Sequence, residues 1–581
     1  MKNCITIIFI LVFNSAFSSS DSLRNPFVWR QMSLFPDSNN YHVFFGGPGS
    51  VFRSLSFSQN VFLTYDNHFI FSREQSDMPY IKNLSPIVDV QYILGDELEQ
   101  NLSLYHNQSI SDKSHYAISF LKRSHDGYYA NQATNNNFFQ LNYLNQSFDS
   151  SYNILIGLKH HRIYQQQNGG LSNDSLFINS LDFSTNRKVL NINMDHAYSS
   201  EKFWRAFINQ QWTFKKQSDS TFKSSIKKLF FNTSIERKSR TYFDSLNADL
   251  FLYNYNNSFS TNDTLSLDIL SNKLNYCIKS VKDSVISSYS LGWNSQVIAQ
   301  KNHLIDTLLT NQSTEFNYSK INQKSTLKLY ADFFLFGYKK NNYSLNLFFK
   351  RKIFNNKVFK FSANMKKYKP VFEINTFQSN HHMWDNNQFN DVLFWNLTGL
   401  LSHRTFNLKT EYHSISRPIY FKRFDIPQQY DSAAQVIKTS ISHNFSNNKL
   451  NIFSEITYQY QGGPKIFQLP NWIGQLKFNY ILINKKSNLK IEAGCNLRAF
   501  SSYYLPVYLP EINQFSISNE FLQQNYAMVD LIIKAIIKDV TVFGMVTHLN
   551  SGLMGYNYFS SLHYPSPDRY IKFGLKWSFL D

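Results

Sequence analysis

Apolar and polar residues alternate along several stretches of the chain. In residues 570–579, every second position is apolar: Ile571, Phe573, Leu575, Trp577 and Phe579. The same period of two recurs in residues 489–499, 343–350 and 475–482. Successive side chains of a β-strand point to opposite faces, so each stretch predicts a strand with one apolar and one polar face. These runs suit the roughly 9 to 11 residues that a tilted strand needs to cross a membrane.

Residues 527–546 allow two interpretations. This stretch is apolar apart from Asp530, Lys534, Lys538 and Asp539, and charges four residues apart also fit one face of a helix. Its many Ile and Val residues favour strands, because β-branched side chains pack well on a pleated surface. We therefore predict two strands that meet at Lys538 and Asp539. Polar connections at 484–487 and 355–357 predict short turns between other strands.

The predicted strands are expected to close into a ring. An unpaired backbone group in lipid costs several kcal/mol, so only a closed sheet gives every strand two partners. The chain ends on an alternating strand with Trp577 and Phe579 near its tip, as outer-membrane barrels commonly do, although Leu580 and Asp581 follow. The predicted fold class is all-β: a transmembrane antiparallel β-barrel of about 16 strands, within a range of about 14 to 18, with short periplasmic turns and longer extracellular loops.

The N-terminus has the pattern of a secretory signal peptide. Lys2 precedes an apolar run at residues 5–13, and small residues follow up to Ser18. The run is about half the roughly 20 residues of a spanning helix, and no later run approaches that length. We predict a signal peptide at residues 1–18, cleaved on export, and a barrel with a short N-terminal lead-in segment at residues 19–581. The expected location is the bacterial outer membrane, as an integral protein.

Aromatic residues reach 17% of the chain, with 54 Phe and 36 Tyr, although the mean hydropathy is −0.36. Aromatic girdles facing lipid, combined with a polar lumen, explain both values. A proteome rich in Phe, Tyr, Asn, Lys and Ile codons is an alternative explanation that stays open. Cys4 lies in the predicted signal peptide, and nothing in the spacing of Cys277 and Cys495 favours a disulfide over two separate thiols.

No group of residues predicts catalysis, a metal site or a cofactor. His381 and His382 with Asp385 have the side chains of metal ligands, but adjacent residues of a strand point to opposite faces, and the pair at 160–161 is interpreted in the same way. The turn at 46–50 lacks the Lys-Ser/Thr end of a phosphate-binding loop, and no Gly-x-Ser-x-Gly motif occurs. We expect that the protein is not an enzyme; an outer-membrane hydrolase is the enzymatic alternative.

The formal net charge of +18 indicates an anionic environment or partner. The basic residues are spread over alternating faces and loops without forming a groove-reading motif, so nucleic acid is not an expected partner. They suit contact with anionic lipopolysaccharide and a lumen that favours anions; a wall without selectivity is the alternative. The residues predicted to line the pore, because their neighbours form the apolar face, are Lys490, Glu492, Arg498, Lys572 and Lys576. Outer-membrane lipid, the barrel-assembly machinery and small solutes are the other expected partners, and a homo-oligomer is compatible with the sequence.

Several short motifs carry a family resemblance. They are the turn Phe45-Gly46-Gly47-Pro48-Gly49-Ser50, Gly95 with Glu99-Gln100, the segment with Arg123-Ser124, Asp126-Gly127-Tyr128-Tyr129 and Asn131-Gln132, the loop Asn168-Gly169-Gly170, and Val529-Asp530-Leu531, Tyr564-Pro565 and Phe573-Gly574-Leu575 near the end. In these residues the chain resembles the putative porin family of Bacteroidetes outer membranes. The resemblance implies a pore, and it supplies neither a substrate nor catalytic or binding residues.

These features together predict a porin-like channel. The polar inner face, with no evident plug domain or energy-coupling motif, favours passive diffusion of small hydrophilic solutes through a water-filled lumen, with a bias toward anions. The alternative is a non-conducting outer-membrane scaffold or surface-interaction protein whose lumen is filled by side chains.

Overall fold

The computed structural model describes residues 41–58, 86–179, 186–216, 223–245, 260–282, 284–302, 306–353, 357–386, 389–422, 426–484, 486 and 488–580. The predicted signal peptide at residues 1–18 lies outside these ranges. Helical structure in the described part of the chain is limited to α5 (Asp174–Asn179), the 3-10 turn η1 (Arg187–Val189) and α6 (Phe372–Asn375). Across the described ranges, no helix is long and apolar enough to cross a membrane.

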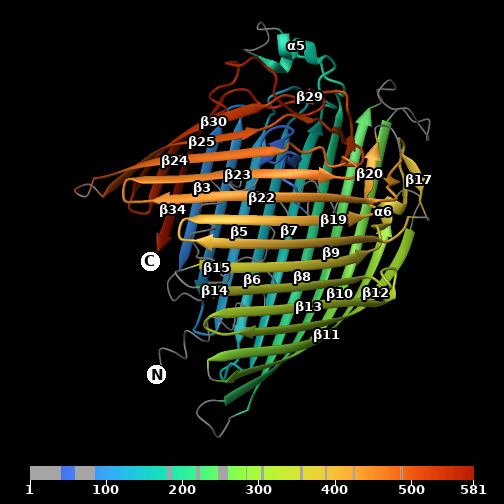
Figure 1. The fold of residues 1–581 in the computed structure, drawn as a ribbon, viewed down its shortest axis with the longest axis vertical. Coiled ribbons are helices and arrows are strands. Elements are labelled where there is room, and N and C mark those ends of the chain that lie inside the picture. Colours follow the sequence, from blue (N-terminus) through green and yellow to red (C-terminus); the bar gives the residue numbers. More distant parts are fainter. Residues whose placement is uncertain are drawn as a thin grey trace.

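The body of the protein is a closed antiparallel barrel of 22 strands, each paired with the next along the chain (Figure 1). The first strand, β3, pairs with the last, β34, and this pairing closes the ring. The barrel strands are β3 (Ile87–Gly95), β4 (Glu99–Ser109), β5 (Ser114–His125), β6 (Thr134–Gln146), β7 (Tyr152–Gln167), β8 (Ala197–Lys216), β9 (Lys223–Ser245), β10 (Ser260–Lys282), β11 (Val285–Lys301), β12 (Asp306–Ile321), β13 (Ser325–Gly337), β14 (Tyr343–Ile353), β15 (Lys357–Tyr368), β18 (Val392–His403), β19 (Phe406–Ser416), β22 (Ala433–Ser446), β23 (Leu450–Gly462), β24 (Trp472–Asn484), β25 (Leu489–Phe500), β30 (Tyr526–Ile537), β31 (Val540–Thr547) and β34 (Tyr570–Leu580).

The antiparallel barrel is the predicted architecture, but the predicted count of about 16 strands, within 14 to 18, is wrong. The physical reason is the shortness of the connections. Turns such as 404–405 and 538–539 contain only two residues, and a strand with its connection takes only about 22 residues on average. The individual strands predicted near 343–350, 475–482, 489–499 and 570–579 are all present. Residues 527–546 form two strands that meet at Lys538 and Asp539, as predicted.

The connections differ strongly between the two ends of the barrel. At one end, which we call the short-turn rim, they are two to six residues long, from 110–113 to 538–539. At the other end, the long-loop rim, four connections exceed 20 residues, namely 168–196, 369–391, 501–525 and 548–569. These and the loop 417–432 contain the small elements β16 (Thr376–Gln378), β17 (Met383–Asp385), β20 (Ile419–Lys422), β21 (Gln428–Gln429), β26 (Tyr503–Tyr504), β27 (Val507–Leu509), β28 (Gln514–Ile517), β29 (Leu522–Gln523), β32 (Phe559–Ser561) and β33 (Tyr564–Pro565). In outer-membrane barrels, the end with longer loops faces the outside of the cell.

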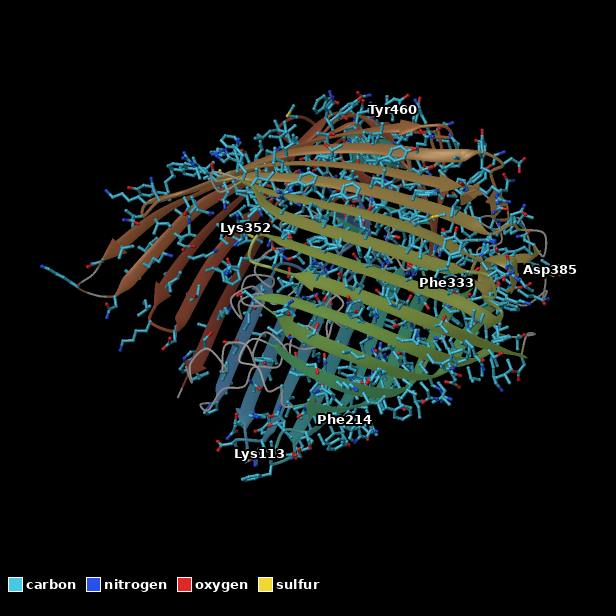
Figure 2. All side chains as sticks on the ribbon, turned by 60° about the horizontal axis from the view of Figure 1, so that its bottom comes forward. Lys113, Phe214, Phe333, Lys352, Asp385 and Tyr460 are labelled. Carbon is cyan, nitrogen blue, oxygen red and sulfur yellow. The ribbon has the colours of Figure 1, made fainter. Side chains whose placement is uncertain are left out.

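The two faces of the wall differ in polarity. Apolar side chains such as Phe214, Phe333 and Tyr460 are exposed on the outer face (Figure 2). On β34, Phe573 and Trp577 are likewise exposed, whereas side chains at the alternating positions face the lumen. Directly opposed residues of neighbouring strands lie on the same face of the sheet. The division into an apolar outer face and a more polar inner face therefore continues from strand to strand around the ring.

One hairpin is much taller than the rest of the wall. Strands β9 and β10 each contain 23 residues, about twice the length that crosses a bilayer. The outward positions of β9 are largely apolar from Leu229 to Ile235, and the next outward residue, Arg237, pairs with Asp268 of β10 at 2.6 Å. Outward positions from there to Ser245 are mostly polar. The upper part of this hairpin therefore extends beyond the apolar band on the side of the long-loop rim.

Candidate functional site

A hairpin lies inside the barrel. Strands β1 (His42–Phe44) and β2 (Phe52–Ser54) pair antiparallel, and the glycine turn at 45–50 joins them. Nearly all of residues 41–58 are buried. We call residues 41–58 the inner hairpin. It lies in the part of the lumen near the long-loop rim, because its contacts are to strand residues at that end.

The tip of the inner hairpin is held by strands β6 and β7. Thr134 donates from its hydroxyl to the carbonyl of Pro48 at 2.9 Å, and Asn136 donates from Nδ2 to the carbonyl of Gly49 at 3.0 Å. The side-chain carbonyl of Gln165 accepts from the backbone N–H of Val51 at 2.9 Å. These polar wall residues satisfy backbone groups of the turn that have no partner within the hairpin.

Glycine is required at two positions of this turn. A Cβ on Gly47 would lie 2.2 Å from Nδ1 of the buried His125. Gly49 has a φ of +94°, and a Cβ there would lie 2.0 Å from Nδ2 of Asn136. Gly46, in contrast, meets nothing closer than 3.4 Å. The close approach of the tip to the wall therefore depends on Gly47 and Gly49.

The other end of the hairpin is held by the opposite wall. Gln459 of β23 accepts from the N–H of Phe57 at 3.1 Å and donates to the carbonyl of Leu55 at 2.7 Å. Arg53 donates from one guanidinium nitrogen to the carbonyls of Phe467 at 2.5 Å and Gln468 at 2.7 Å, in the connection from β23 to β24. In the strand order, β5 to β7 and β22 to β24 lie on opposite sides of the ring. The inner hairpin thus crosses the lumen.

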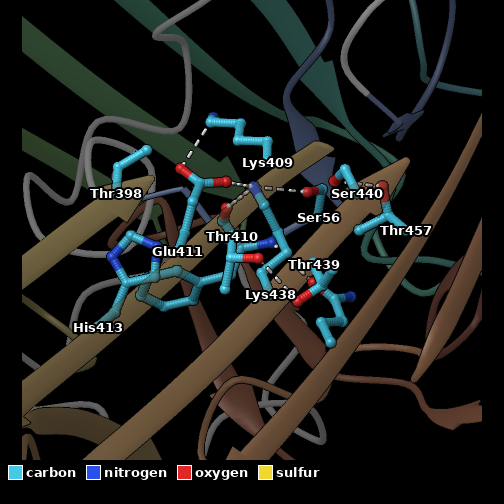
Figure 3. Close-up of polar contacts among 12 residues, drawn as sticks. Ser56, Thr398, Lys409, Thr410, Glu411, His413, Lys438, Thr439, Ser440 and Thr457 are labelled. Carbon is cyan, nitrogen blue, oxygen red and sulfur yellow. Dashed lines mark hydrogen bonds and ion pairs between the residues drawn. The ribbon is translucent and has the colours of Figure 1, made fainter. Parts of the chain in front are cut away.

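A lysine–glutamate cluster lies beside this second anchor (Figure 3). Glu411 of β19 pairs with Lys409 at 2.9 Å and with Lys438 of β22 at 2.8 Å. Lys438 also donates to the hydroxyl of Ser56 at 3.3 Å and to the carbonyl of Phe57 at 3.2 Å, as Figure 3 shows for Ser56. Lys438 is therefore the one cation of this cluster that connects the wall to the hairpin.

Aromatic and aliphatic side chains pack the hairpin against the long loops. The ring of Phe45 lies 5.2 to 5.4 Å from those of Tyr508, Phe515 and Tyr564. Tyr41, Val43 and Leu55 belong to a second buried cluster, whose other members come mainly from the loops after β5, β7, β25 and β31: Tyr129, Leu171, Phe177, Leu190, Ile473, Tyr503, Leu505, Tyr526, Tyr558, Phe559 and Leu562. Hairpin and loops together form a packed layer that joins the two walls.

Burial changes the acid–base properties of two hairpin residues. It lowers the pKa of Arg53 to about 10, so the guanidinium remains charged at neutral pH. Burial, and next to it the carboxylate of Glu455, raises the pKa of Tyr41, whose hydroxyl donates to Glu455 at 3.4 Å. Both side chains therefore act as hydrogen-bond donors at physiological pH.

The five residues predicted to line a pore lie on the inner face of the wall, mostly in ion pairs. Lys490 pairs with Glu492 at 2.6 Å, and Glu492 also lies 3.6 Å from Lys534. Arg498 pairs with Asp530 at 3.0 Å, and Lys572 with Glu99 at 2.7 Å. Lys576 lies on the same face of β34 as Lys572. The structure thus brings Lys490 and Glu492 together and keeps Arg498 and the two lysines of β34 at separate places. Whether they line a conducting pore stays a prediction.

Three inward lysines of strands β14 and β15 have no carboxylate partner in the described part of the chain. Lys350 of β14 and Lys360 of β15 are directly opposite each other in the register, and Lys352 lies two residues along β14 toward the short-turn rim (Figure 2). None of these three lysines forms an ion pair within the described residues, and strands β14, β15 and β18 contain no Asp or Glu. This part of the lumen wall is therefore positively charged.

His381 and His382, considered above as metal ligands, form hydrogen bonds to the wall and to another long loop. His381 lies 3.0 Å from Asp244 and 2.8 Å from the hydroxyl of Thr261, whereas His382 lies 2.8 Å from Glu511. These contacts tie the loop after β15 to strands β9 and β10 and to the loop after β25. Within the described ranges, no group of three or more His, Cys, Asp or Glu side chains is placed to hold a metal ion. Cys277 and Cys495 are free thiols on different strands.

The sequence predicted the glycine turn at 46–50. It did not predict that this turn lies inside the barrel, nor which wall residues bind it. Several motifs of the family resemblance surround the hairpin: Gln132 donates to the carbonyl of Phe45 at 3.2 Å, and Tyr564 packs on its ring. No sequence pattern distinguishes the anchoring residues Gln459, Glu411 and Lys438 from other wall residues, because most strands of the barrel have polar residues at alternate positions.

Solved structures with a similar fold include siderophore receptors and an iron transporter. The siderophore receptor PirA from Acinetobacter baumannii aligns with a TM-score of 0.60 at 10% identity, covering 86% of this chain and 81% of that protein. The FrpB iron transporter from Neisseria meningitidis gives 0.57 at 10% identity, with 86% and 82% covered. The ferric-catecholate import receptor Fiu from Escherichia coli gives 0.56 at 11% identity, with 86% and 82% covered. At this identity the similarity shows the fold alone.

Comparison of the sequence with protein families agrees with the resemblance noted above. No curated protein matches the chain. The family model described as "Putative porin" matches residues 20–581, which is nearly the whole chain. A member of this family with a closed 22-strand barrel is an integral protein of the outer membrane. The chain therefore belongs to the putative porin family.

Proposed function

We propose that this protein is a gated transport channel of the outer membrane, in which the inner hairpin is the gate and small hydrophilic anions are the favoured solutes. The observation that carries the proposal is the crossing of the lumen by residues 41–58, anchored on opposite walls. Transport in this scheme requires movement of the hairpin and no chemical step.

The manner of anchoring supports a gate. Pro48, Gly49, Leu55 and Phe57 are held through their backbone groups by wall side chains. Hydrogen bonds of this kind can be exchanged for bonds to water when the hairpin moves, so each contributes only about 0.5 to 1.5 kcal/mol net. The size of the barrel agrees, because 22-stranded outer-membrane transporters have a plugged lumen.

Removal of the cation that joins wall and hairpin tests the gate. In Lys438→Met, the Ser56 hydroxyl and the Phe57 carbonyl lose a charged donor worth about 1.5 to 3 kcal/mol, so openings should become roughly ten- to a hundredfold more frequent. Single-channel recording of purified protein in planar bilayers measures this. Lys409→Met is the matched control, because Lys409 binds the same Glu411 and has no contact to the hairpin among those described. Equal open probability in both variants and the unmodified protein would argue against the gate.

The lysines of β14 and β15 support the preference for anions. Like charges directly opposite on a sheet repel each other, and a passing anion relieves this repulsion. A unit charge about 4 Å away is worth about 1 kcal/mol in water, so each of the substitutions Lys350→Gln and Lys360→Gln should reduce the anion-to-cation permeability ratio by up to about fivefold. Reversal potentials in a KCl gradient measure the ratio, with Arg351→Gln, an outward substitution on the same strand, as the control. Cation preference in the unmodified protein would contradict the proposal.

The packed layer itself favours a second candidate, a non-conducting scaffold whose loops bind a partner at the cell surface. The buried cluster formed by Tyr41, Val43 and Leu55 with the loops has the character of a stable core. The two candidates differ in one measurable respect: a scaffold stays silent in the bilayer even when the hairpin anchors are removed.

A further inference from the structure

The outer face of strands β5 to β8 carries a row of cations at the long-loop rim. Lys122 is opposite Asn137, Asn137 is opposite Arg162, and Arg162 is opposite Lys202. The three basic side chains are exposed, and none of them forms an ion pair within the described part of the chain. We call Lys122, Arg162 and Lys202 the outer basic row.

An aromatic row lies directly below it, two residues closer to the middle of each strand. Its members are Phe120, Phe139, His160 and Trp204, again opposite one another in the register. The rings of His160 and Trp204 are stacked at 3.8 Å, and Trp204 is 46% exposed. The next row down is aliphatic, with Ile118, Leu141, Leu158 and Ala206. This sequence of charged, aromatic and aliphatic rows is the profile of a bilayer from the headgroups inward.

The charges of this face are unbalanced. Glu99 and Glu201 are the acidic residues of strands β4 to β8, and both point to the lumen, where Glu99 pairs with Lys572 and Glu201 lies beside Asn513 and Arg240. Arg162 and Lys202 are directly opposed, with Cβ atoms about 5 Å apart in such a pair, and like charges in this position destabilise a sheet. An anion held between them would remove that repulsion, and Arg supplies a planar fork that suits phosphate.

We propose that the outer basic row binds the phosphate groups of a phosphorylated glycolipid in the outer leaflet, while the aromatic row below contacts its sugar and upper acyl region. The lipid is favoured over a soluble anion because the cations are continuous with the lipid-facing band and point away from the lumen. Basic residues near a membrane surface contribute about 1 kcal/mol each to binding of anionic headgroups.

The test uses the full-length protein and a defined probe, a diphosphorylated glucosamine-disaccharide lipid, with binding measured by native mass spectrometry. Arg162→Gln with Lys202→Gln should weaken binding about thirtyfold. The control is Lys320→Gln with Arg351→Gln, two exposed outward cations near the short-turn rim, which should leave binding unchanged. The substituted side chains are exposed on the wall, and heat-modifiable migration on gels verifies that each barrel is folded.

Two further arms separate the sources of phosphate. The same lipid without its phosphates should not bind, and millimolar inorganic phosphate should not displace the intact lipid. Equal binding of the phosphate-free lipid would show that apolar contact alone is responsible. Displacement by inorganic phosphate, or unchanged binding in the Arg162/Lys202 variant, would likewise overturn the proposal.

Discussion

Replacement of residues 41–58 by a Gly-Ser segment of equal length is expected to open the barrel. The hairpin contributes Tyr41, Val43, Phe45 and Leu55 to the packed layer, and its loss removes both anchors and the link between the walls. Single-channel current should rise on the order of tenfold or more, since a 22-strand barrel encloses a wide lumen. Planar-bilayer recording measures the change, and liposome swelling with sugars shows whether uncharged solutes also pass.

This variant should still assemble. All 22 strands begin after residue 86, and the closing pair of β3 with β34 has no contribution from the hairpin. Heat-modifiable gel migration provides the control for folding. A folded variant that carries no more current than the unmodified protein would show that the lumen stays closed without the hairpin, and the hairpin would lose its proposed role as gate.

Alanine at Gly47 or Gly49 is expected to displace the tip of the hairpin. At Gly49, alanine must adopt a left-handed conformation, which costs roughly 1 to 2 kcal/mol, and its Cβ collides with Asn136. At Gly47 the Cβ meets the ring of buried His125, and overpacking of this kind costs roughly 1 to 3 kcal/mol. The displaced population should therefore grow about ten- to a hundredfold.

The rate of trypsin cleavage after Arg53 measures this displacement of the hairpin. Arg53 is 3% exposed and hydrogen-bonded to two carbonyls, so the protease reaches the bond after it only when the hairpin leaves its place. Gly46→Ala is the matched control in the same turn, because a Cβ there has ordinary contacts. Cleavage at Arg53 that is equally slow in all three variants would mean that the tip tolerates the added atoms and that the anchoring described here is weaker than its geometry indicates.

The alternation of side chains was sufficient to predict the wall. Apolar residues occupy one face and mostly polar or small residues the other in the segments 570–579 and 489–499. Both segments are strands of the barrel, with the apolar face toward lipid and the other face toward the lumen. The strand count failed for a different reason. Two-residue turns such as Arg404-Thr405 leave no composition signal, and the alternation of β10 or β12 is interrupted by outward polar residues such as Asn272 and Gln312.

The gate could not be predicted in this way. The inner hairpin is only 18 residues long, and its strands of three residues each are too short for any period to be recognised. Its burial arises from contacts with residues some 400 positions later in the chain, such as Gln459 and Phe467. Two of the predicted pore-lining cations illustrate the same limit: the charge of Arg498 or Lys572 was evident, but its neutralisation by Asp530 or Glu99 required the register of the neighbouring strands.

The tall hairpin of β9 and β10 determines which part of the protein an antibody or other large molecule outside the cell contacts first. From Ile235 to Ser245 the strand rises about 3.3 Å per residue at a tilt of about 45°, so Ser245 stands roughly 23 Å above Ile235, after which the outward positions of the strand become mostly polar. An epitope inserted between Ser245 and Ser260 would be displayed to antibodies on intact cells. The same epitope in the connection 96–98, directly after the outward Leu94, would lie among the sugars of the leaflet and stay hidden.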